Sequence, residues 1–386
     1  MKAIKQDPMF RFLAVLTIAS VVGLQSWRTL FNNFAVEIVH LEGNNIGIIQ
    51  SVREIPGFLA LLAIFIIMIM KEHRLSALSI ILLGIGVGIT GLLPSYYGLI
   101  ATTMLMSFGF HYYETTNQSL TLQYFDHRIS PWIFGKLRSY SAATNVGVGI
   151  AIFILSSLWE YKQVYLIFGL LIVSAGIWGF LQNPARKNVV PQHKKMVFKK
   201  TYWLFYFLTF MSGARRQIFV AFAVFLLVKK FDYTIQEVTI LFVINNVINY
   251  FLSPSIGRAI IKFGERRILS IEYSSLIVVF ISYAFVESKI IVAVLYIIDH
   301  IFFNFSIAIR TYFQKVADPR DIAPSMAVGF TINHIAAVIL PAIGGFLWIV
   351  DYKIPFLVGS VMSIISLLAI QKIKISTSHN KYPKHL

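Results

Sequence analysis

The chain has 386 residues, of which 57% are hydrophobic and only 13% charged, with a mean hydropathy of +0.72. Soluble domains carry about 25% charged residues, so this composition excludes an ordinary soluble protein. The absence of cysteine excludes disulfides, iron–sulfur clusters and thiolate zinc sites. A net charge of +17 would favour nucleic acid as the partner of a soluble chain. In a membrane protein, however, basic residues collect in cytoplasmic loops, so we expect a lipid bilayer and no nucleic acid.

Twelve apolar stretches are long enough to form transmembrane helices. In chain order they lie near residues 11–36, 46–70, 75–93, 98–124, 132–159, 163–181, 202–228, 236–256, 268–286, 290–314, 325–349 and 354–371. A basic segment with two prolines, residues 184–201, follows the sixth stretch. We therefore expect an all-α membrane protein with a cytoplasmic linker between two six-helix bundles, residues 1–183 and 202–386.

The basic residues also predict an orientation. Most of the 34 lysines and arginines lie in the two tails and in the loops on the same side of the predicted bundles. The opposite side carries only Lys162, Lys229, Lys230, Lys289 and Lys353. Because lysine and arginine are retained in the cytoplasm, both termini should be cytoplasmic. The first apolar stretch is too long for a secretory signal, and the short loops favour a bacterial cytoplasmic (inner) membrane.

Four arginines, Arg28, Arg53, Arg215 and Arg216, lie inside predicted spans. A charged side chain at the bilayer centre costs about 2.5–3.5 kcal/mol. We therefore expect these arginines to face a polar cavity and to meet a counter-ion or a ligand there. Because Arg215 and Arg216 are neighbours in one helix, they project about 100° apart, and only one should point fully into the cavity.

Other polar side chains concentrate in seven of the predicted spans, whereas the third, sixth, ninth and twelfth contain almost none. Candidate substrate ligands are Arg28, Asn32, Arg53, Tyr112, Arg215, Arg216, Asn245, Asn249, Asn304 and Asn333. Candidate proton-binding groups are Glu54, Glu114, Asp299, His111 and His300, because burial favours a neutral carboxyl group and histidine titrates near neutral pH. We expect Glu272, close to a cytoplasmic helix end, to be solvated.

These residues also have structural interpretations. Arg53 and Glu54 could form an ion pair that holds the second helix against a neighbour, and the asparagines could form interhelical hydrogen bonds. A metal site at His111 and His300 would need a third ligand that the sequence cannot place. Neither a nucleotide-binding loop nor a nucleophilic triad is visible, so we expect no cofactor, no metal and no enzymatic activity.

The two halves of the chain repeat each other. Arg28 and Arg216 are each followed by the pattern x-x-Phe-x-x-Phe-Ala-Val, and His111 and His300 recur at nearly the same interval. Repeats with the same topology form one known transporter architecture, with the binding site between the halves. The two six-helix bundles should therefore be pseudo-symmetric.

The segment after the eighth span carries two glycines and several basic residues, namely Gly257, Arg258, Lys262, Gly264, Arg266 and Arg267. This segment resembles the cytoplasmic loop motif of the major facilitator superfamily. Together with the repeat, it makes essentially the whole chain similar to that superfamily. Ile261 stands where that motif usually has aspartate, and Lys262 where it has arginine. The resemblance implies that these residues form a cytoplasmic gating loop and that the predicted polar helices surround a cavity.

Four membrane arginines outnumber the three well-buried acids Glu54, Glu114 and Asp299, which favours an anionic solute. We therefore predict a monomeric secondary transporter that moves a small organic anion by alternating access, coupled to protons. Two alternatives stay open on the residues alone. One is a transporter-fold binding or sensor protein that does not turn over. The other is an uncoupled facilitator, or an exporter of amphipathic compounds.

Overall fold

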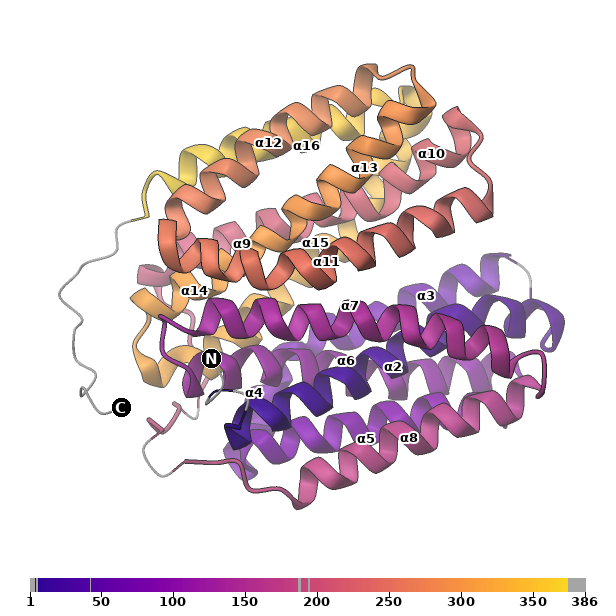
Figure 1. Cartoon of the computed structure of the whole chain (residues 1–386), viewed down its shortest axis with the longest axis horizontal. Coiled ribbons are helices and arrows are strands. Elements are labelled where there is room, and N and C mark those ends of the chain that lie inside the picture. The colour runs from indigo at the N-terminus through magenta and orange to yellow at the C-terminus, as the bar shows by residue number, and fades with distance from the viewer. Residues whose placement is uncertain (1–3, 5, 42, 187–188, 194, 374–386) are drawn as a thin grey trace.

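The computed structural model describes residues 4, 6–41, 43–186, 189–193 and 195–373, and these residues fold into helices joined by short connections (Figure 1). No strand occurs among them. Nine helical segments of this described part are long and apolar enough to cross a membrane. The expectation of an all-α membrane protein is therefore confirmed.

Each predicted span falls on helical residues. The first half contains α2 (Pro8–Glu37), α3 (Gly43–Phe58), a 3-10 turn η1 (Leu59–Leu62), α4 (Ala63–Ile69), α5 (Glu72–Thr90), α6 (Tyr96–Tyr124), α7 (Ser130–Leu155) and α8 (Tyr161–Leu181). The second half contains η2 (Lys200–Tyr202), α9 (Trp203–Gln217), η3 (Ile218–Ala223), α10 (Val224–Phe231), α11 (Ile235–Phe263), α12 (Glu265–Phe285), α13 (Lys289–Phe303), η4 (Asn304–Ser306), α14 (Ile307–Val316), η5 (Pro319–Asp321), α15 (Ile322–Val350) and α16 (Lys353–Ile370).

Local sequence explains where α11 begins and ends. Thr234 accepts a hydrogen bond from the Glu237 amide, and the Glu237 carboxylate accepts one from the Thr234 amide, which is a capping box. At the other end Gly264 has a φ of +79°, a conformation that glycine adopts readily. The helix therefore runs to Phe263, so Gly257, Arg258 and Lys262 are helical rather than part of a loop as predicted.

Three of the long helices are interrupted near the middle of the molecule, by η1 after α3, by η3 after α9 and by η4 after α13. A 3-10 turn follows α3 shortly after Pro56, whose missing N–H weakens the helix there. A π-helical segment, η3, follows α9 directly after Arg216 and Gln217. Such segments are rare and occur often at functional sites. The breaks place irregular backbone beside the intramembrane arginines.

The buried apolar side chains form two large clusters. One collects residues between Met9 and Ile172, and the other collects residues between Val197 and Ile373 with three contributions from the first half, Ile64, Leu122 and Phe134. Each half of the chain thus packs mainly around its own core, and the helices of the two halves form separate groups in Figure 1. Polar groups placed between the two halves are outside both cores.

The two halves are tied together near the linker between α8 and η2, at an end of the molecule that we call the linker end. The Gln314 side chain donates hydrogen bonds to the carbonyl oxygens of Leu122 (2.6 Å) and Phe125 (2.7 Å). It also accepts one from the Ser130 hydroxyl (2.5 Å). One amide therefore joins α14 to both sides of the α6–α7 turn, and this closes the linker end.

Glycine lets α7 and α11 approach each other at the same end. A Cβ on Gly135 would lie closer than 3.0 Å to the Ser253 carbonyl oxygen, and one on Gly257 would lie equally close to the Pro131 carbonyl oxygen. Real Cβ atoms do not make such contacts, so these positions need glycine for close helix packing. Gly257, predicted as a loop residue, thus serves the contact between the two halves.

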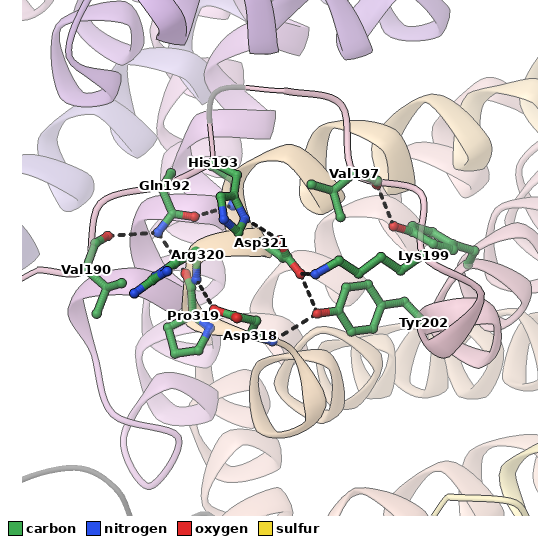
Figure 2. A network of polar contacts seen from close by, with 12 residues as sticks. Val190, Gln192, His193, Val197, Lys199, Tyr202, Asp318, Pro319, Arg320 and Asp321 are labelled. Carbon is green, nitrogen blue, oxygen red and sulfur yellow. Dashed lines mark hydrogen bonds and ion pairs between the residues drawn. The ribbon is translucent and has the colours of Figure 1, made fainter.

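The linker itself is held by a buried aspartate (Figure 2). The Asp321 carboxylate, fully buried, accepts hydrogen bonds from Lys199 Nζ (2.5 Å), Tyr202 Oη (2.6 Å) and His193 Nδ1 (2.7 Å). Burial alone would raise the pKa of Asp321, but the hydrogen bonds from Lys199, Tyr202 and His193 lower it below its usual value. We call this group the linker clasp, because it pins the linker to the α14–α15 turn.

We expect Asp321→Asn to lower the free energy of unfolding by about 1–3 kcal/mol, the usual contribution of hydrogen bonds to a charged group. Lys199 is half-exposed, which weakens its share. Since the folded pKa is depressed, the stabilisation is present above the unfolded pKa of about 4 and is lost as the pH falls through the folded value. Thermal melts of wild type and variant at pH 7 and below pH about 4 measure this.

Asp318→Asn is the matched control, because Asp318 is an exposed neighbour whose side chain accepts only from the Arg320 amide in the described residues. An equal loss in both variants at pH 7, or a loss that persists at acid pH, would contradict the clasp.

Candidate functional site

A cavity of about 770 Å³ lies between the two halves. Its lining includes residues of α2, α3, α6 and α7 from the first half and of η3, α11, α13 and α14 from the second. A second space of about 390 Å³ shares Arg28, Glu114, Arg138 and Arg310 with it and extends towards α15. Because they share these residues, the two spaces are parts of one compartment, which we call the central chamber.

Five arginines line the central chamber. Arg28, Arg53, Arg138 and Arg310 line the larger space, and Arg216 lines the smaller one. Sequence reasoning singled out Arg28, Arg53 and Arg216 but assigned the other two to cytoplasmic loops. The signal was present, because both lie inside predicted spans. Because they lie near the ends of those spans, the sequence did not show that α7 and α14 place them inside the chamber.

Most of this positive charge is not neutralised. Arg53 forms an ion pair with Glu54 (2.5 Å). For Arg28, Arg138, Arg216 and Arg310, no carboxylate of the described residues lies within ion-pair distance. Arg138 and Arg310 instead lie over aromatic rings, at 5.0 Å and 5.6 Å from the ring centroids. Such contacts are worth far less than an ion pair to a desolvated charge, so the chamber carries four guanidinium groups that lack a direct ion pair with a described carboxylate.

A polar stripe of α6, formed by His111, Glu114 and Gln118, faces the chamber and the space beside it. Glu114 and Gln118 line both of its spaces, whereas His111 lies one turn earlier and borders a third space of about 190 Å³ beside Arg53 and Glu54. The 3-then-4 spacing of the three residues places them on one helix face. Glu114 is the one carboxyl group that the described chamber lining contributes to the two larger spaces.

Amide side chains of the second half are linked in a chain of hydrogen bonds. Asn304 donates to Asn249 Oδ1 (2.6 Å), and the Asn249 amide donates to His300 Nε2 (2.8 Å). Asn249 and His300 line the chamber, whereas Asn304 is buried behind them and holds Asn249 in place. Asn333 lines the smaller space and donates to the Thr209 carbonyl oxygen (3.2 Å).

Besides Asn304, three further predicted ligands, which come from α2, α6 and α11, do not line the chamber. Asn32 lies on an exposed part of α2. Tyr112 is buried in a small apolar cluster, where its hydroxyl donates to a backbone carbonyl oxygen (3.4 Å). Asn245 is 1% exposed and lies away from the chamber lining. Residue type and span were the basis of these predictions, but the rotation of each helix decides which face meets the chamber.

Arg215 is also not a chamber residue. It is 4% exposed, donates to Glu272 Oε1 (3.1 Å), and stacks over Tyr273 with its guanidinium carbon 4.4 Å from the ring centroid. Glu272 is itself 1% exposed, so the prediction of a solvated carboxylate is wrong. The α12 helix carries Glu272 about 10 Å inward from Glu265, where it meets α9. Asp299, 3% exposed, lines the same small space between these helices.

Comparison with known proteins gives the chain a family. A sequence model of the Major Facilitator Superfamily matches residues 11–336. The chain belongs to the major facilitator superfamily. Among solved structures, the human organic anion transporter MFSD10 has a TM-score of 0.76 at 10% identity and covers 94% of this chain and 99% of its own. No curated protein matches the sequence.

Two further structures are similar to this superfamily member. A bacterial homologue of the iron transporter ferroportin, in its outward-facing state, has a TM-score of 0.75 at 13% identity, covering 94% of this chain and 98% of its own. The transporter FucP, in its outward conformation, has a TM-score of 0.76 at 12% identity, covering 95% and 98%. At these identities the similarity shows the fold alone. The chain is accordingly a membrane protein with the transporter fold of this superfamily.

The loop motif of the superfamily lies at the linker end in this chain. Arg266 donates to Gln371 Oε1 (2.8 Å and 3.1 Å), Arg258 donates to the Ser255 hydroxyl (2.9 Å), and Lys262 and Arg267 are exposed. Sequence reasoning missed the buried partner: Glu265, fully buried, forms an ion pair with Lys315 of α14 (2.8 Å). A charge pair therefore joins α12 to α14, although the usual aspartate of the motif is absent.

We expect Arg215→Met to destabilise the protein by about 3–5 kcal/mol, because it leaves Glu272 buried without its partner. Arg216→Met, at the adjacent position, should change stability little, since that side chain faces the chamber. Melting temperatures of the two purified variants in detergent decide this. Equal losses would mean that the buried pair contributes nothing of its own.

Proposed function

We propose that this chain is a secondary transporter that moves a small organic anion by alternating access, coupled to protons. The observation that carries the proposal is the group of four guanidinium groups, those of Arg28, Arg138, Arg216 and Arg310, around one chamber without carboxylate partners.

Electrostatics favour an anionic occupant. Guanidinium groups bind carboxylate and phosphate oxygens through paired, charge-assisted hydrogen bonds. They are costly to bury unless such a partner is present. The larger space, of about 770 Å³, falls within the range of about 300–1,000 Å³ that is usual for small-molecule sites. Asn249, His300 and Gln118 add uncharged hydrogen-bonding groups that would orient the solute.

The closed linker end supports alternating access. Gln314 and the α7–α11 glycines hold the halves together there. With the termini in the cytoplasm, as the distribution of basic residues predicts, the chamber would be reached from outside the cell. FucP of E. coli is a fucose:proton symporter and MFSD10 an organic anion transporter. Since these similarities concern the fold, the choice of an anion rests on the arginines of this chain.

Proton coupling is supported by the charge balance at Asp299. Two buried carboxyl groups, Asp299 and Glu272, share a small space with the single ion-paired guanidinium of Arg215. Arg215 can neutralise one carboxylate, and an unpaired buried carboxylate is costly. The second acid is therefore best placed to carry a proton. Arg216 lines both this space and the chamber, so an anion bound to Arg216 would favour a proton on Asp299.

The other predicted proton-binding groups have different surroundings. Glu54 is held by Arg53, which favours its charged form. His300 accepts a hydrogen bond from Asn249. Glu114 lines both spaces of the chamber together with Arg310 and Arg138. For these groups and for His111, a part in proton coupling stays a prediction, and we base the coupling proposal on Asp299.

For the anion site we expect Arg28→Ala and Arg216→Ala each to weaken anion binding by about 10–100-fold, the loss of one hydrogen-bonded charge contact. A thermal-shift screen of the purified wild-type protein against carboxylates and organic phosphates identifies the ligand. Titration of that ligand then measures each variant.

Arg128→Ala is the control, because Arg128 is exposed in the α6–α7 turn. Unchanged binding in both chamber variants would refute the anion site. A ligand that binds but never accumulates in proteoliposomes would refute transport while leaving the site intact.

For coupling we expect Asp299→Asn to abolish the response of uptake to an imposed pH gradient while counterflow of the solute continues. The amide cannot carry the transported proton but keeps the shape of the side chain. Proteoliposomes with and without a gradient provide the measurement. Wild-type uptake that ignores the gradient would indicate a facilitator, and a variant that still responds would move the coupling group elsewhere.

A further inference from the structure

A second cluster of functional groups lies beside the central chamber. Glu54 of α3, His111 of α6 and His334 of α15 point towards one another, and their ligand atoms all lie within 4.8 Å of each other. His334 Nε2 is 4.0 Å from the Glu54 carboxylate, and the two imidazole rings meet edge to face with centroids 4.9 Å apart. Sequence reasoning paired His111 with His300 and found no third ligand, whereas the fold brings His111 to His334 instead.

Hydrogen bonds fix the tautomer of both histidines. His111 Nδ1 lies 2.9 Å from the Ser107 carbonyl oxygen and 2.9 Å from the Ser107 hydroxyl. That hydroxyl already donates its proton to the Arg53 carbonyl oxygen (2.5 Å). Both neighbours can therefore only accept, so the His111 proton is on Nδ1. His334 Nδ1 likewise donates to the Phe330 carbonyl oxygen (2.9 Å).

The remaining ring nitrogens are thus free to act as ligands. With both protons on Nδ1, each Nε2 presents a lone pair. Metal-binding histidines almost always donate their other ring N–H to a carbonyl or carboxylate in this way. Glu54 supplies a third donor, because Oε1 is held by Arg53 while Oε2 faces His334.

Gly57 leaves room for the two imidazole rings beside α3. A Cβ on Gly57 would lie closer than 3.0 Å to ring atoms of both His334 and His111. Glycine at this position, one helical turn after Glu54, is what lets the two imidazoles approach α3. The three ligands and the space between them therefore depend on Gly57 as well as on their own side chains.

We propose that Glu54, His111 and His334 form a binding site for zinc or a similar divalent transition metal. Two imidazoles and one carboxylate, with a fourth position open, are a common zinc donor set. Tetrahedral zinc would place the donor atoms about 3.4 Å apart, so the three groups must close by roughly 1 Å, which side-chain rotation allows. The proposal goes beyond transport of an anion and does not depend on it.

The charges around the site determine which fourth ligand the proposed metal would take. Arg28, Arg53 and Arg216 border the same space of about 190 Å³, and they oppose a bare cation. These guanidinium groups would stabilise a negatively charged fourth ligand, so the proposed metal would take an anion there, either hydroxide or a carboxylate from the chamber. A single anionic ligand would then contact both the metal and the arginines of the chamber.

Metal binding would also join the two halves. Glu54 and His111 belong to the first half, and His334 to the second. The three donors come together only while α15 lies against α3 and α6, the arrangement seen here with the linker end closed. Zinc should therefore stabilise this conformation over one in which the halves separate at the linker end.

The test is zinc binding by the untagged, full-length protein in detergent after treatment with a chelator. We expect one zinc per chain by competition with a zinc indicator, and cobalt absorption bands typical of tetrahedral coordination. His111→Ala and His334→Ala should each lower zinc affinity by more than the roughly 10–100-fold that loss of an outer-shell partner costs. Gly57→Ala should do the same while leaving all three ligands present.

His127→Ala serves as the control, because His127 lies in the α6–α7 turn and pairs with Asp126 there. Zinc should raise the melting temperature of wild type and of this control but not of His334→Ala. Absence of stoichiometric zinc binding in wild type would overturn the proposal, as would equal affinity in His334→Ala and His127→Ala. Because no transported solute is involved, such a failure would leave the anion proposal standing.

Discussion

The free-energy cost of burying a guanidinium group away from water explains where this protein places its intramembrane arginines. An arginine within an apolar span must find a counter-charge, an aromatic face or a watery space. All three solutions occur here: Arg215 pairs with Glu272, Arg138 lies over Phe303, and Arg28 faces the chamber. The chamber exists because the two halves pack around separate cores and leave their polar faces to meet between them.

Arg215 and Arg216 show that two adjacent arginines can have different environments. They are adjacent, yet one is locked inside the second half and the other lines the chamber. A turn of about 100° per residue separates them, so a single helix carries one charge buried against α12 and one that faces the chamber. The π-helical segment that follows, η3, begins only two residues after Arg216. This places the least regular backbone of α9 and α10 beside the arginine of α9 that lines the chamber.

The linker end is built from different interactions. There the halves meet through the amide of Gln314, through glycines that allow backbones to touch, and through the linker clasp around Asp321. Such polar contacts can break and reform against water at a modest net cost, unlike an apolar core. A closure of this kind is what the proposed alternating access requires, because the two halves would separate at that end, and the proposed metal site would add to the closure from within the membrane.

The sequence by itself determined the all-α class, the approximate spans and the need for a polar interior, because apolar run length and buried charge are local properties that a bilayer penalises directly. Only the tertiary structure decided which charges share that interior. In the folded chain Arg138 and Arg310 line the chamber, whereas Arg215 and Tyr112 do not. Glu272 is buried, and His334 lies beside His111. Each change follows from how a helix is rotated and how deeply it is set against a distant neighbour, and no local pattern encodes that.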